Sequence, residues 1–154
     1  MPTNYEIDKL DRQILRLLMK DSRMPFLEIS RLLDVSGGTI HQRVERLKKE
    51  GIITGSKLTI DLKKLGYGIT VLLGVHLNST KCLKTVMPKL KAISEITEIY
   101  YTTGNFSLII KAHAKDIEDF HHFLVNKLQQ LDEVQSTESF ICLDIPLDKD
   151  APII

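Results

Sequence analysis

The side chains best suited to a chemical role lie together at residues 36–46, where hydroxyl, amide and guanidinium groups follow two glycines. Ser36 is a good helix N-cap, and Val35 before it and Ile40 four residues after it have the spacing of a hydrophobic staple. Glutamine and arginine read base edges in the major groove of DNA, and the free N–H groups at a helix start favour a phosphate. The pattern predicts a DNA-reading helix with contacts from Ser36, Gly38, Thr39, Gln42, Arg43 and Arg46.

Three short amphipathic helices are expected to position this stretch. The first follows Asp8, the second begins at Pro25, and the third runs from Ser36 to Gly51. Only two or three residues separate the second helix from the third, and such a link forces the large crossing angle of a helix-turn-helix. Two other interpretations stay open, namely an ordinary solvated helix surface and a winged helix that binds a protein.

Charge is distributed unevenly along the chain. The net charge of the 154 residues is only +1, but all six arginines lie within the first 46 residues. Residues 1–60 carry a net charge of +3 and residues 61–154 a net charge of −2. A nucleic acid, if one binds, is therefore expected on the N-terminal part.

Two further segments separate the helices from the rest of the chain. Residues 52–60 place β-branched residues around a Gly-Ser pair, which predicts a short hairpin or wing. Residues 61–68 contain Gly66 and Gly68 and are expected to form a linker. The predicted organisation is a helix-turn-helix domain at 1–60, a linker at 61–68 and a second domain at 69–154.

The second domain shows the order strand, helix, strand, strand, helix, strand. Its expected elements are strands at 69–77, 97–103, 106–114 and 134–145, and helices at 81–93 and after Asp116. Pro88 is expected to kink the first of these helices or to shift its start toward Val86. The order predicts a ferredoxin-like βαββαβ domain, so the chain belongs to the α+β class. Its strands are more apolar than a sheet with one wet face requires, which predicts that a second copy covers the open face.

Several motifs together resemble the Lrp/AsnC, or feast/famine, family of transcription regulators. They are Leu10-Asp11, Ser36-Gly37-Gly38-Thr39-Ile40, Arg43-Val44 with Leu47, Gly51-Ile52-Ile53, Leu65-Gly66 and Thr103-Gly104. The resemblance covers essentially the whole chain. The stretches at 100–104 and 135–138 look closest to the asparagine-responsive branch of the family.

The resemblance implies a ligand and an assembly that composition alone does not show. It implies a double-stranded DNA partner, a homodimer formed through the sheet domain, and four dimers in an octameric ring. It also implies an amino-acid effector, with asparagine suspected, at the contact between dimers. Carried onto this sequence, the effector residues are Tyr101, Thr103, Gly104, Asn105 and Phe106, with Gln135, Ser136 and Thr137 opposite. The same residues could instead form only a hairpin turn and solvated strand positions.

Other classes of function find little support in the residues. The five histidines and two cysteines fit no nucleophile, metal or phosphate-loop spacing, so no enzyme activity, metal or cofactor beyond the effector is expected. No apolar run is long enough to span a membrane, and the N-terminus does not resemble a signal peptide, so a cytoplasmic location is expected. An assembly that senses an effector but acts through a protein partner is the main alternative to DNA binding.

Overall fold

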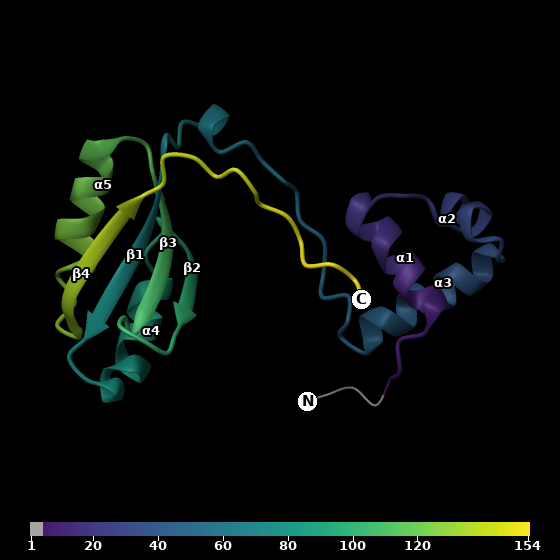
Figure 1. Cartoon of the computed structure of the whole chain (residues 1–154), viewed down its shortest axis with the longest axis horizontal. Coiled ribbons are helices and arrows are strands. Elements are labelled where there is room, and N and C mark those ends of the chain that lie inside the picture. Colours follow the sequence, from purple (N-terminus) through teal and green to yellow (C-terminus); the bar gives the residue numbers. More distant parts are fainter. Residues whose placement is uncertain (1–4) are drawn as a thin grey trace. The chain divides into compact units, whose positions relative to one another are not determined.

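A computed structural model describes residues 5–154 and divides the chain into two compact units (Figure 1). One unit contains the residues up to Thr59 together with Lys149–Ile154, and the other is Ile60–Asp148. The first unit holds helices α1 (Lys9–Lys20), α2 (Phe26–Leu33) and α3 (Gly37–Lys49). The three helices confirm the predicted helix-turn-helix.

Local capping explains where the first and third helices begin. Asp8 and Asp11 form a capping box at α1, in which each carboxylate accepts a hydrogen bond from the other residue's backbone N–H. Ser36 caps α3, and its Oγ accepts a hydrogen bond of 3.1 Å from the Thr39 N–H. The chain leaves α3 through Gly51, whose φ of +72° favours glycine. The helices pack around a core of Ile14, Ile29, Ile40 and Val44.

Two sequence expectations for the first unit were wrong. Residues 52–60 form no strand, so the predicted hairpin is absent; nearly all of this stretch is exposed, and no apolar face holds it in a sheet. Pro25 is the N-cap of α2 rather than its first helical residue, because its ψ of 137° is extended.

The second unit is a four-stranded antiparallel sheet with strand order β2-β3-β1-β4. Its strands are β1 (Ile69–Leu77), β2 (Ile96–Tyr101), β3 (Leu108–Ala114) and β4 (Val134–Ile141). Helices α4 (Leu83–Lys91) and α5 (Ile117–Phe123) lie on one face of this sheet, and a π-helical stretch at Leu124–Leu128 continues α5 (Figure 1). The order and the layers confirm the ferredoxin-like prediction.

Alternation along the central strands separates a core from an open face. Val71, Leu73, Val75 and Leu77 of β1 are buried against the helices. The intervening positions of β1 lie on the other face, where Leu72 remains 38% exposed. Phe140 of β4 pairs with Leu72 and is also exposed, so apolar side chains gather on this open face.

Element ends differ from the predictions at several places in or after this unit. Strand β2 ends at Tyr101 rather than at residue 103, and β3 begins at Leu108 rather than at residue 106, because residues 102–107 form the loop between them. Helix α4 begins at Leu83 and continues through Pro88, because Pro88 and Lys84 are exposed and water can reach the carbonyl that Pro88 leaves unpaired. Strand β4 ends at Ile141, four residues before the predicted end. Residues 149–154 group with the helices rather than with the sheet, because Arg12 and Arg16 donate hydrogen bonds to the carbonyls of Ile154 and Ile153. None of the helices in the described part of the chain is long and apolar enough to cross a membrane.

Candidate DNA-binding and effector sites

The start of α3 presents small and polar groups that face solvent. Ser36 and Thr39 form a hydroxyl pair with oxygens 2.8 Å apart, and Gln42 is exposed one turn further on. Added Cβ atoms would meet nothing within 4 Å at Gly37 and only the Ser36 oxygen, at 3.8 Å, at Gly38. Packing within the chain therefore does not require either glycine, and another molecule can approach the backbone here closely.

Arg43 lies on the same helix but its side chain turns toward the start of α1. Its Nη1 donates to Asp8 Oδ2 at 2.5 Å and to Asp11 Oδ1 at 3.2 Å. The Asp11 N–H and the Arg43 guanidinium hold the pKa of Asp8 below its usual value, and Asp8 and Asp11 together raise the pKa of Arg43. Sequence reasoning placed Arg43 on the outward face and missed these two partners.

Arg46 has a different environment. Its guanidinium carbon lies 4.1 Å from the centre of the Tyr5 ring, which is the geometry of a cation–π contact. Within residues 5–154 its side chain makes no hydrogen bond or ion pair. A stacked guanidinium keeps its N–H edges available, so Arg46 can still bind a phosphate. The structure therefore places Ser36, Gly38, Thr39, Gln42 and Arg46 at an accessible surface, and Arg43 among carboxylates.

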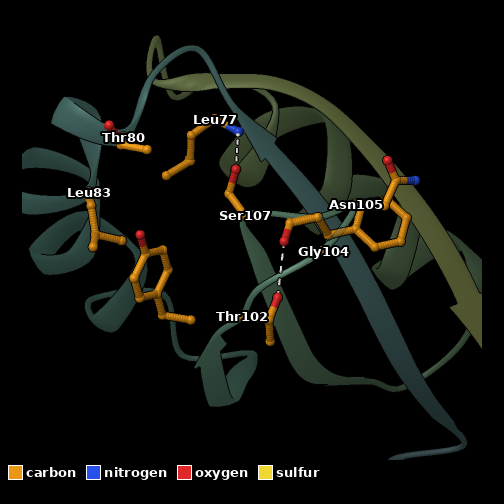
Figure 2. A pocket seen from close by; sticks show the side chains of 9 residues that line it. Leu77, Thr80, Leu83, Thr102, Gly104, Asn105 and Ser107 are labelled. Atoms are coloured by element: carbon orange, nitrogen blue, oxygen red, sulfur yellow. Dashed lines mark hydrogen bonds between the residues drawn. The ribbon is translucent and has the colours of Figure 1, made fainter.

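The loop between β2 and β3 lines an open pocket of about 180 Å³ (Figure 2). Four of the predicted effector residues are at this pocket: Tyr101, Gly104, Asn105 and Phe106. A pocket smaller than the roughly 300–1,000 Å³ of drug-sized sites is suited to a small ligand such as a free amino acid.

Sequence reasoning missed five further lining residues, namely Leu77, Thr80, Leu83, Thr102 and Ser107. Their place follows from topology, because β1 pairs with β3 in a register that sets Val75 opposite Leu108 and so brings the end of β1 beside the loop. The predicted strand order contained this signal. Thr80 and Leu83 then follow, since the chain turns from β1 into α4 at the same end of the sheet (Figure 2).

Hydrogen bonds hold the base of this loop and leave its tip free. Ser107 Oγ accepts from the Leu77 N–H at 3.2 Å, and Thr102 Oγ1 donates to the Phe106 carbonyl at 3.0 Å (Figure 2). In the part of the chain that the structure describes, the backbone N–H groups of residues 103–106 make no hydrogen bond. Gly104 has a φ of +106°, a conformation that glycine permits and that opens the turn.

Not all predicted effector residues meet at the pocket. The Asn105 carboxamide points away from the wall formed by Thr80 and Leu83 (Figure 2). Thr103 does not line the pocket, nor do Gln135, Ser136 and Thr137, which lie on β4 across β1 from the loop. Thr137 Oγ1 instead accepts a hydrogen bond of 3.1 Å from Gln129. The structure of one chain thus brings four of the eight predicted effector residues together at the pocket and leaves the other four apart from it.

The Phe106 ring connects the pocket with the open face of the sheet. It covers Gly74, where an added Cβ would lie 2.6 Å from three ring atoms. It also lies 4.9 Å from the His76 ring and 6.4 Å from the Phe140 ring, measured between centroids. Among the described residues there is no group of three or more His, Cys, Asp or Glu side chains that could hold a metal ion.

Comparisons with known proteins match both units. The family model described as the Lrp/AsnC ligand binding domain matches residues 70–152, and that of a winged helix-turn-helix DNA-binding domain matches residues 7–54. Regulatory protein AsnC of Escherichia coli K12 is 44% identical over 94% of this chain and 95% of its own length. The HTH-type transcriptional regulator Ptr1 of Methanocaldococcus jannaschii is 39% identical over 89% of this chain and 92% of its own length.

Solved structures of related regulators have the same fold as this chain. The structure of E. coli AsnC superposes with a TM-score of 0.92 at 42% identity and covers 96% of this chain and 99% of that one. A transcriptional regulator of Neisseria meningitidis, solved as an L-Met complex, superposes with a TM-score of 0.89 over 94% of each chain. Its identity of 20% supports the fold alone.

Proposed function

Since the chain belongs to the Lrp/AsnC family of transcription regulators, we propose that asparagine is the effector that modulates its binding to DNA. The chain is a DNA-binding regulator with an amino-acid-binding domain, and its family consists of regulators rather than enzymes. The stretches at 100–104 and 135–138, which resemble the asparagine-responsive branch of the family, favour asparagine over other amino acids.

The observation that carries this proposal is the set of free backbone N–H groups around Gly104 at the pocket. Successive N–H groups in a turn form a concave donor surface for an anion, here the α-carboxylate of an amino acid. The hydroxyls of Thr80 and Ser107 line the same pocket, and each can donate to or accept from a side-chain amide. Leu77 and Leu83 supply an apolar wall that excludes a charged side chain.

We propose that the rest of the effector site comes from another copy of the chain. The predicted effector residues on β4, together with Thr103, do not line the pocket of one chain, and a neighbouring dimer could supply them. The apolar open face, with Leu72, Phe106 and Phe140, fits a homodimer contact, and a tetramer of dimers follows by family resemblance. The measurement is analytical ultracentrifugation, in which a monomer at all concentrations would contradict this assembly.

For DNA we propose that α3 enters the major groove. Ser36, Gly38, Thr39 and Gln42 would lie nearest the bases, and Arg46 would contact a phosphate. We propose 1–60, 61–68 and 69–148 as the DNA-binding domain, the linker and the effector domain, and assign 149–154 to the DNA-binding part. As a regulator of bacterial or archaeal type, the protein would act in the cytoplasm, where the DNA is.

Fluorescence anisotropy tests both halves of the proposal. The protein is titrated onto a labelled duplex from upstream of its own gene at two salt concentrations, with L-asparagine, L-glutamine, L-methionine or no addition. We expect salt-sensitive binding that L-asparagine shifts and the other two amino acids do not, because effector and DNA binding are coupled. DNA binding that another amino acid shifts would refute asparagine, and binding no tighter than to a random duplex would favour a protein partner.

A matched pair of variants tests the loop. Gly104→Ala strains a residue at positive φ next to the donors, whereas Gly66→Ala introduces the same strain in the linker at a φ of +92°. We expect only the first variant to weaken asparagine binding measured by calorimetry. Equal losses in the two variants would show that the loop has no special role.

A further inference from the structure

We infer that Arg43 is a positioning residue of α3, which it fastens to the start of α1, and that it does not contact DNA. The inference rests on the proposed DNA-binding role of α3. By this inference, most polar side chains of α3 contact DNA, whereas Arg43 fixes the orientation of α3 relative to α1.

The Asp11 carboxylate, which pairs with Arg43, is buried, and both of its oxygens accept hydrogen bonds. Asp11 has no exposed surface, and its Oδ2 accepts from the Tyr5 hydroxyl at 2.6 Å and from the Asp8 N–H at 3.1 Å. Its Oδ1 accepts from Arg43 at 3.2 Å. A buried carboxylate needs such partners, because an uncompensated charge in a protein interior is strongly unfavourable.

The same guanidinium also reaches the residue that caps α1. Nη1 of Arg43 pairs with Asp8 Oδ2 at 2.5 Å, and Asp8 Oδ1 accepts from the Asp11 N–H at 2.9 Å. One arginine on α3 therefore holds both carboxylates of the capping box. Both ion pairs use Nη1 of Arg43, so a DNA phosphate that drew the guanidinium away from the capping box would break both pairs and leave Asp11 without its cation.

Arg46 provides the internal comparison. It lies one turn after Arg43 on the same helix, has no ion pair in the described chain, and its guanidinium stacks on Tyr5. Tyr5 is connected to both arginines. Its hydroxyl donates to Asp11, which also binds Arg43, and its ring stacks with the Arg46 guanidinium. This cluster, Tyr5, Asp8, Asp11, Arg43 and Arg46, joins the segment before α1 to the second half of α3.

The sign of a charge effect distinguishes positioning from direct contact. Asp11→Asn removes a negative charge from the DNA-binding unit, so electrostatics alone would tighten DNA binding. If Arg43 positions α3, the same change loosens the helix and weakens binding. Glu28→Gln is the matched control, since Glu28 is an exposed residue of α2 whose side chain makes no hydrogen bond or ion pair within residues 5–154.

The experiment compares the full-length wild type with Arg43→Ala, Arg46→Ala, Asp11→Asn, Tyr5→Phe and Glu28→Gln. Each is titrated by anisotropy onto the duplex used above at several salt concentrations, and its Tm is measured. For Arg43→Ala and Asp11→Asn we expect a roughly tenfold weaker Kd, the effect of about one lost base contact, and a Tm lower by about 4 °C or more. The salt slope of Arg43→Ala should equal that of the wild type, whereas Arg46→Ala should lower the slope by about 0.9.

Three results would overturn the inference. The first is DNA binding by Asp11→Asn that is tighter than that of the wild type, to the extent seen with Glu28→Gln. The second is a salt slope lowered by about 0.9 in Arg43→Ala. The third is a Tm loss in the double variant Arg43→Ala/Asp11→Asn that equals the sum of the two single losses. Tyr5→Phe changes no charge and keeps the test usable if the ion-pair variants unfold; we expect a weaker Kd in the same direction, and an unchanged Kd and Tm would count against the cluster. Absence of DNA binding by the wild type would instead refute the proposed function, and the Tm comparison would still decide the role of the ion pair.

Discussion

Gly74 and Phe106 provide a test of how the sheet and the effector pocket are coupled. Gly74 lies in β1 beneath the Phe106 ring, and a Cβ there would approach three ring atoms to 2.6 Å. Ordinary contacts begin at 3.4 Å, so in Gly74→Ala the ring must move by about 0.8 Å. The ring cannot move without changing its contact with His76 and the wall of the pocket.

The cost follows from two opposing effects. Overpacking costs about 1–3 kcal/mol, and replacing a strand glycine by alanine recovers about 0.5–1 kcal/mol through the unfolded chain. We therefore expect Gly74→Ala to lower the free energy of unfolding by about 1 kcal/mol, the difference between the middles of these two ranges. Asparagine binding should weaken as well, because Phe106 lines the pocket.

The assay is urea unfolding followed by circular dichroism at a fixed protomer concentration, because subunit association contributes to apparent stability. Phe106→Leu and the double variant complete a cycle. A smaller side chain at 106 should relieve the clash, so the double variant should be more stable than the sum of the single losses predicts. A Gly74→Ala variant as stable as the wild type, with additive losses, would refute the reasoning.

Three other predictions concern single side chains. Ser36→Ala should lower the free energy of unfolding by about 1 kcal/mol in urea, since α3 loses its N-cap. Gln42→Ala should weaken DNA binding by about 1–3 kcal/mol in anisotropy without changing the Tm, because Gln42 is exposed. Burial lowers the pKa of His113 below its usual value of 6.5. As the pH drops below about 6.5, His113 is therefore protonated in the unfolded chain but stays neutral in the native state, and the free energy of unfolding falls. His113→Gln should show a smaller loss of stability than the wild type between about pH 7.5 and about pH 5.5 in urea unfolding; an equal loss would contradict this cause.

The elements that sequence reasoning predicted well are those whose signals are local. Asp8 and Ser36 mark helix starts by capping, and the alternation of β1 between buried and open positions is visible in residues 69–77. Strand order followed from the sequence of elements, because few topologies accept strand, helix, strand, strand, helix, strand.

The failures concern partners that are distant in sequence. Arg43 has the composition of a DNA contact, and only the folded chain shows that it meets Asp8 and Asp11, more than thirty residues earlier. Residues 52–60 have strand formers but no apolar face to pack, so propensity did not produce a hairpin. Thr80 and Leu83 could have been predicted as pocket residues from the strand register, whereas residues 149–154 gave no local signal of their contacts.

The grouping of residues 149–154 with the helices makes the DNA-binding unit discontinuous in sequence. The chain leaves this unit after Thr59 and returns to it at Lys149. Two chain segments therefore connect the DNA-binding unit to the sheet unit, where a single linker was predicted. Cleavage within 61–68 would leave the second connection intact, and a purification tag fused after Ile154 would be attached to the part that binds DNA. Tags at that position therefore belong among the variables of any binding measurement on this protein.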